Sequence, residues 1–223
     1  KRQTSRDPRL ELLARVRELG DSTSIARLQP LMSDEDEAVA LEAVSVMNHL
    51  HGPKGNGYTA APKQPTTQLP VPPATDVRVR ITMAPTTGGG VFDIVMNAAD
   101  APMAVARISQ LIRNKYYDGL TWHRVVPNFV LQGGSPGMNE FVGDGPFMRD
   151  ELGPAHHDRF TLGISTRGRD TGDAQIFINL IDNFRLDHNY TVFARIIEGM
   201  DNVDKILEGD VIESIEIRRK TQP

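Results

Sequence analysis

The chain has 223 residues, enough for one large or two small domains, with 24% charged and 39% hydrophobic residues as in ordinary globular proteins. Its formal net charge of −4 gives no indication of a nucleic-acid-binding surface, and no apolar run approaches the length that spans a bilayer. The absence of cysteine excludes disulfides, thiol nucleophiles and cysteine zinc sites, and leaves the redox compartment open.

Residues 1–51 are expected to form a small helical segment. The first helix is indicated by apolar residues at helical spacing before Gly20, namely Leu12, Leu13, Val16 and Leu19. Asp21–Ser24 offers N-caps for a short second helix, and Ser33–Asp36 resembles a capping box at the start of a third. Gly52-Pro53 ends that third helix.

The stretch Met32–Ala43 resembles helical repeats of the HEAT or armadillo type. Only about one and a half units are visible, whereas a solenoid needs at least ~3 repeats to bury its faces. The segment is therefore the end of a longer array or a group of helices that packs on a second domain. A plain helical cap is an equal alternative.

Residues 52–75 are expected to form a linker, because proline recurs throughout the stretch together with glycine, threonine and alanine. From Asp76 the pattern changes to strands, so residues 76–223 form the second predicted domain. Val77–Met83 alternates apolar and polar residues, Gly88–Gly90 provides a turn, and Val91–Met96 returns.

Two helices are predicted within this second domain. One follows Pro102, with proline in its first turn and an apolar face of Val105, Ile108, Leu111 and Ile112. The other is expected near Asn202–Leu207. Many short strands with two helices favour a closed β-barrel capped by helices, so the fold class is mainly β.

The most informative stretch is Trp122–Gly134, which places Arg124, Phe129 and Gln132 in a short apolar run that ends in a glycine pair. Strict alternation would put Arg124 and Phe129 on opposite faces of one strand. Because Pro127 lacks a ladder donor, we expect the strand to break or bulge there. The three side chains can then converge on one surface.

This run resembles the signature of the cyclophilins, the peptidyl-prolyl cis–trans isomerases. The resemblance continues through Thr161–Ser165, Asp173–Ile178, Leu186–His188 and Tyr190–Met200, and covers roughly residues 76–218. It implies an eight-stranded barrel and an enzyme that accelerates rotation about Xaa–Pro bonds in peptides and unfolded proteins without a cofactor. Proline-containing peptides or unfolded clients are the implied partners, and the helical segment is a candidate for binding a protein partner.

The uncatalysed Xaa–Pro bond crosses a barrier of about 18–20 kcal/mol because the amide is conjugated. A catalyst needs one fixed donor aimed at the proline nitrogen of the twisted amide, and an apolar slot for the ring. Arg124 is the natural donor, since a guanidinium stays charged and has a fixed fork of N–H groups. The resemblance implies the same role for Arg124, and a catalytic site of Arg124, Phe129 and Gln132.

The resemblance also implies the residues that hold the substrate. The apolar floor comprises Phe129, Val130, Phe177 and Leu186, with Tyr190 at a position where the family usually has histidine. Gln132 and Gln175 are expected to hold the substrate backbone, and Gln132 also to orient Arg124. The segment Ser165-Thr166-Arg167 matches the strand whose backbone pairs with the substrate, which resembles β-augmentation.

Three positions depart from the family pattern. Val130 replaces the usual methionine and reduces the floor, and Tyr190 resembles the bacterial members. Arg185 stands where many eukaryotic members have the tryptophan that supports cyclosporin binding, so we expect weak inhibition by cyclosporin. The compartment is unknown: the chain starts Lys1-Arg2-Gln3, which suits a bacterial cytoplasmic protein or one exported after removal of a leader.

Two other motifs are rejected as sites. Gly133–Gly137 fits the Gly-x-Ser-x-Gly nucleophile elbow, but the elbow needs the N–H after the serine and Pro136 has none. No metal site is predicted, because His156-His157 and His49-x-His51 lack companion ligands at metal spacing, and we expect solvated histidines.

A proline-peptide binding or scaffold module with weak catalysis is the alternative from another class, since the same pocket would serve it. Arg124 favours catalysis, because gripping a peptide does not require a donor at the amide nitrogen.

Overall fold

The computed structural model describes residues 6–34, 36–52, 57–61, 71–88, 90–145 and 147–218. The chain divides into two compact units, Gln3–Thr67 and Gln68–Pro223. Among the described residues, no helix has the length and apolar character needed to cross a bilayer.

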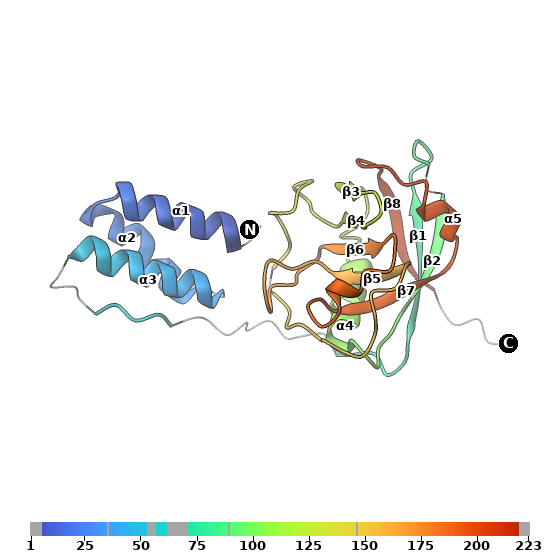
Figure 1. Cartoon of the computed structure of the whole chain (residues 1–223), viewed down its shortest axis with the longest axis horizontal. Coiled ribbons are helices and arrows are strands. Elements are labelled where there is room, and N and C mark those ends of the chain that lie inside the picture. Colours follow the sequence, from blue (N-terminus) through green and yellow to red (C-terminus); the bar gives the residue numbers. More distant parts are fainter. Residues whose placement is uncertain are drawn as a thin grey trace. The chain divides into compact units, whose positions relative to one another are not determined.

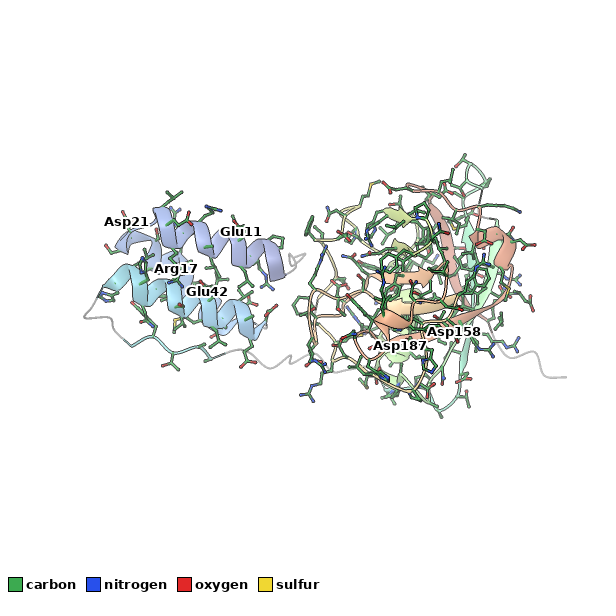
Figure 2. The ribbon with its side chains drawn as sticks, viewed as in Figure 1. Glu11, Arg17, Asp21, Glu42, Asp158 and Asp187 are labelled. Carbon is green, nitrogen blue, oxygen red and sulfur yellow. The ribbon has the colours of Figure 1, made fainter. Side chains whose placement is uncertain are left out.

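The first unit contains two long helices, α1 (Arg6–Leu19) and α3 (Glu37–His51), joined by the single-turn α2 (Ile25–Leu28) and two 3-10 turns. Asp36 caps α3 by accepting the Ala38 N–H at 3.0 Å. α1 and α3 lie side by side (Figure 1), and Arg17 donates to Glu42 across them at 2.8 Å (Figure 2). The apolar faces form a core of Leu13, Ile25, Leu28, Val39, Ala43, Val46 and Met47. The predicted helical segment is thus present, and its likeness to HEAT repeats stays a prediction.

The second unit is mainly β, as expected. Its strands are β1 (Val77–Met83), β2 (Val91–Met96), β3 (Arg124–Val126), β4 (Val130–Gly133), β5 (Thr161–Ile164), β6 (Ile176–Asn179), β7 (Val192–Glu198) and β8 (Ile212–Arg218). They form one antiparallel sheet in the order β3-β4-β6-β5-β7-β2-β1-β8. Figure 1 shows this sheet curling around the unit's interior.

The prediction of a closed barrel is too strong. β3 and β8 are the two ends of the sheet and have no ladder between them. Short backbone contacts just before each strand connect these ends: the Trp122 N–H donates to the Asp210 carbonyl at 3.0 Å, and the Ile212 N–H to the Leu120 carbonyl at 2.8 Å. β3 is only three residues long, which limits the pairing at this edge.

Two helices accompany the sheet. α4 (Pro102–Arg113) starts at the predicted proline and buries Val105, Ile108, Leu111 and Ile112 in the main core. α5 covers only Met200–Val203, so the helix expected near Asn202–Leu207 starts earlier and is a single turn. Gly199, the residue before α5, has φ of 81°. The Leu207 N–H donates to the Asp210 carboxylate in a separate turn.

Candidate active site

The Trp122–Gly134 run forms a hairpin, so of the two outcomes expected at Pro127, a break or a bulge, the structure has the break. β3 and β4 pair in register, with Arg124 opposite Gln132. The turn uses Asn128 at φ of 56°, and the Phe129 N–H donates to the Val126 carbonyl at 3.1 Å. Arg124 and Gln132 are neighbours because of this pairing, and Phe129 reaches them from the end of the turn.

The sheet register aligns the central side chains in one row across four strands. Arg124 lies opposite Gln132, Gln132 opposite Phe177, and Phe177 opposite Gly163. Residues directly opposed on antiparallel strands share a face of the sheet. A Cβ atom at Gly163 would lie 2.3 Å from Cζ of Phe177, so the ring occupies the space that a side chain at 163 would fill.

A cavity of about 190 Å³ lies over this row, below the ~300–1,000 Å³ of drug-sized pockets and suited to one small ring. Its lining contains all the expected site residues except Gln175, together with one that sequence reasoning missed, Glu140. The lining residues are Arg124, Phe129, Val130, Gln132, Glu140, Ser165, Thr166, Arg167, Phe177, Leu186 and Tyr190.

Arg124 is held by two of its three nitrogens. Nη1 donates to Oε1 of Gln132 at 3.2 Å, and Nε lies 3.3 Å from Oε1 of Glu140. Its guanidinium carbon is 5.9 Å from the centre of the Phe129 ring. Within the described part of the chain, Nη2 donates no hydrogen bond, so its N–H groups remain available beside the cavity.

Gln175 lies behind the cavity instead of on its wall. Its side-chain carbonyl accepts from Nε2 of Gln132 at 3.0 Å, and its own Nε2 donates to the backbone carbonyls of Glu140 and Val142 at 3.2 and 3.1 Å. Gln132 also donates to Oγ of Ser165 at 2.9 Å. Both amides are therefore engaged with the protein, which suits positioning of Arg124 and of the Glu140 loop.

Glu140 bridges two arginines at the mouth of the cavity. Its second oxygen lies 3.1 Å from Nη2 of Arg167, whose guanidinium carbon is also 5.0 Å from the centre of the Phe141 ring. Asn139 holds the loop by accepting the N–H groups of Phe141 and Val142 at 2.8 and 3.1 Å. Local sequence gives no signal for this role, because the partners of Glu140 come from other parts of the chain.

The floor of the cavity rests on a buried histidine. The His157 ring stacks on Phe177, with centres 5.9 Å apart and planes 8° apart, and Tyr190 meets both rings edge-on. The expectation of a solvated histidine is wrong for His157, which is fully buried, and holds for its exposed neighbour His156. The sequence interpretation missed this because only the tertiary fold brings His157 under Phe177.

Asp187 joins the two histidines. It lies 2.6 Å from Nδ1 of His156 and 2.9 Å from Nδ1 of His157, and accepts the His157 backbone N–H at 2.8 Å. Desolvation opposes ionisation of Asp187, but these hydrogen bonds outweigh it and lower its pKa to about 2. Burial lowers the pKa of His157, whereas the hydrogen bond to Asp187 raises that of His156.

Ser165-Thr166-Arg167 follows the end of β5 and lines one side of the cavity. The Ser165 N–H donates to the Gln175 carbonyl at 2.9 Å, and the Arg167 N–H to Oγ1 of Thr171 at 2.8 Å. Within the described residues the Thr166 backbone N–H has no partner, so it is available to a bound peptide. No group of three or more metal-binding side chains occurs in the described part of the chain.

Comparisons with known proteins agree on one family. The family model described as "Cyclophilin type peptidyl-prolyl cis-trans isomerase/CLD" matches residues 80–222. A peptidyl-prolyl cis-trans isomerase of Helicobacter pylori is 40% identical over 120 residues, covering 52% of this chain and 74% of the relative. Peptidyl-prolyl cis-trans isomerase B of Bacillus subtilis is 34% identical over 119 residues, covering 52% and 83%.

A solved structure gives the same result for the fold. The crystal structure of a Cryptosporidium parvum cyclophilin type peptidyl-prolyl cis-trans isomerase matches with a TM-score of 0.59 at 23% identity, covering 65% of this chain and 99% of the other. A second structure of that protein, determined in the presence of the dipeptide Ala-Pro, matches with a TM-score of 0.58.

Proposed function

The chain belongs to the family of cyclophilin-type peptidyl-prolyl cis–trans isomerases, and from that membership we propose how its cavity accelerates rotation about Xaa–Pro bonds. The chain is a peptidyl-prolyl cis–trans isomerase, and proline-containing peptides are its substrates. Arg124 is the donor, Gln132 and Gln175 position it, and Phe129, Val130, Phe177 and Leu186 receive the proline ring.

The free nitrogen of Arg124 carries this proposal. As the amide twists, its conjugation is lost and the proline nitrogen regains a lone pair that can accept a hydrogen bond. Because Gln132 and Glu140 hold Nη1 and Nε, the remaining Nη2 is presented with little reorganisation. A preorganised donor that bonds better to the twisted amide than to the planar one lowers the barrier.

The Thr166 backbone is the proposed docking edge for the peptide. Its free N–H can pair with the substrate main chain, which tolerates different side chains around the proline. Tyr190, packed edge-on against Phe177, bounds the floor on that side. The substrate is then anchored by its backbone and its ring, while the bond between them rotates beside Arg124.

The test is exchange NMR on a proline tetrapeptide with Arg124→Ala and Arg124→Lys. Removal of a transition-state donor costs about 10²–10³-fold in rate, so Arg124→Ala should lose that much activity. Lysine keeps the charge but not the fork, and should recover little of the loss. As a control, Arg113→Ala on the exposed end of α4 should stay within about two-fold of the wild type.

Equal activity of Arg124→Ala and the wild type would contradict the assigned role. Peptide-induced shifts without faster exchange in the wild type would instead favour a binding module.

A further inference from the structure

A second row of aligned side chains crosses the sheet on strands β8, β1, β2 and β7. Arg218 lies opposite Arg78, Arg78 opposite Val95, and Val95 opposite Arg195. With neighbouring strands about 4.8 Å apart, the row spans about 14 Å. Its members share one face of the sheet, and the three arginines are exposed while the flanking Val79 and Ile94 point into the core.

The charges in this row are only partly compensated. Arg78 and Arg218 lie close enough to Asp93 to help lower the pKa of its carboxyl, after the larger effect of Arg80, and Arg218 also lies 3.9 Å from Glu216. Within the described part of the chain, the side chains of Arg78 and Arg195 make no hydrogen bond. Like charges directly opposite each other, as in Arg78 and Arg218, destabilise an antiparallel pair. A bound anion would remove that cost.

The next row along the same strands is built differently. There Arg80 lies opposite both Asp93 and Glu216, and it donates to the two oxygens of Asp93 at 2.7 and 2.8 Å. The Asp93 carboxylate has Glu198 on its other side. This acidic row pairs its single arginine internally, so the unpaired arginines of the first row are a local feature and not the rule on this face.

The arginine row borders a groove of about 550 Å³, almost three times the volume of the catalytic cavity. Val95 lies between Arg78 and Arg195 in the register, and Val77 and Ile197 also belong to the lining of the groove. Asp76, on its edge, accepts the Ala98 N–H at 3.1 Å. The groove is too large for one inorganic anion, and its lining contains both guanidinium groups and apolar side chains.

We propose that this groove binds an acidic segment of a partner protein, with carboxylates on Arg78, Arg195 and Arg218 and apolar side chains between them. Guanidinium groups bind carboxylates through paired, charge-assisted hydrogen bonds. The inference is independent of the catalytic assignment, because no residue of the groove lines the catalytic cavity.

A nucleic acid suits the groove less well. Residues 68–223 contain 16 basic and 20 acidic residues, so the unit as a whole repels a polyanion. The acidic row lies two residues, or about 6.7 Å, further along the strands. A phosphate backbone would meet that row, whereas a short acidic peptide can be confined to the arginines.

Two acidic residues of the first unit, Asp34 and Asp36, already have a basic partner within that unit. Asp34 accepts from Arg9 at 2.6 and 2.7 Å, and Asp36 lies 3.8 Å from the same guanidinium and caps α3. The proposed occupant is therefore another protein.

The test is an NMR titration of the ¹⁵N-labelled chain of residues 1–223 with a hexapeptide that alternates glutamate and valine. We expect saturable shifts at the amides of Arg78, Val95 and Arg195, and weaker binding as salt rises. The double variant Arg78→Gln/Arg195→Gln should weaken binding at least about tenfold. Arg113→Gln/Arg149→Gln removes the same charge at exposed positions elsewhere, and should change affinity less than about two-fold.

The double variant is expected to melt at or above the wild-type temperature, because it removes like charges that face each other. No saturable shifts in the groove, or equal weakening in the control variant, would overturn the proposal. Tighter binding of an oligothymidylate at the same amides would overturn the assignment to a protein segment.

Discussion

The carboxylate of Glu140 lies 3.3 Å from Nε of Arg124, which places an acid directly beside the guanidinium that lines the candidate cavity. The same carboxylate holds Arg167 at 3.1 Å, so one side chain restrains two arginines at the cavity mouth. Loss of this acid should loosen Arg124 without removing it.

We expect Glu140→Gln to lower kcat/KM by about two- to five-fold, a modest effect because ion pairs between partly exposed side chains contribute about 0.2–1 kcal/mol. The glutamine keeps the size of the side chain, so the loop should stay folded. Asp204→Asn, which breaks the exposed ion pair with Arg159, is the matched control. An equal loss in that control would show an effect of total charge instead.

The guanidinium of Arg185 lies 4.4 Å from the centre of the ring of Phe129, a residue that lines the cavity. We expect weak inhibition of the wild type by cyclosporin, because the family's tryptophan at this position is absent. Arg185→Trp should tighten the inhibition constant by about tenfold or more, since a tryptophan adds a large apolar surface. A nanomolar constant for the wild type would contradict this prediction.

The pair of histidines on Asp187 predicts opposite effects of pH on stability. The pKa of His157 is lowered by burial, so its contribution to stability is present above pH 6.5 and is lost as pH falls through its folded pKa. The pKa of His156 is raised by Asp187, so its contribution is present below pH 6.5 and is lost as pH rises through its folded pKa. The contribution of Asp187, whose pKa is lowered, is present above pH 3.8 and is lost as pH falls through its folded pKa of about 2.

Thermal unfolding of His156→Gln and His157→Phe between about pH 5 and pH 8 checks these signs. Relative to the wild type, His156→Gln should lose more stability at the acid end than at the basic end. His157→Phe keeps a ring against Phe177 and removes the titration, so its melting temperature should fall less on acidification. Parallel pH profiles for all three proteins would show that neither histidine is linked to folding.

The two units have separate cores that share no residue. We therefore expect a chain cut to residues 68–223 to fold alone and to keep kcat/KM on a tetrapeptide within about two-fold, as for changes remote from a site. The measurement is the isomerase rate together with the melting temperature of both chains. Loss of activity in the shortened chain would show that the helical unit supports the catalytic one.

The strands at the start of the second unit were predictable because their period is local. Val77–Met83 and Val91–Met96 alternate clearly, and both agree with β1 and β2 at each end. The helix at Pro102 was equally visible. The interruption at Pro127 was also predicted, but the sequence did not distinguish a bulge from the tight turn that the structure forms, with Asn128 at φ of 56°.

The family signature predicted most of the residues that line the candidate cavity, but not the residues that support them. The supporting contacts join residues more than fifteen positions apart in the sequence, and involve Glu140, His157 and Asp187. The local sequence pattern carries no information about such contacts. Gln175 was visible in the signature, yet its place behind Gln132 depends on how the Glu140 loop closes over it.

Gly163 has no side chain, and the Phe177 ring of the cavity floor occupies the space that this leaves. Because the Phe177 ring fills the space of the absent side chain, even a methyl group there would displace the ring. The backbone ladder between β5 and β6 could remain intact while the recess disappeared. A side chain at position 163 would therefore change the shape of the recess proposed for the proline ring, while the strands that carry it stayed paired.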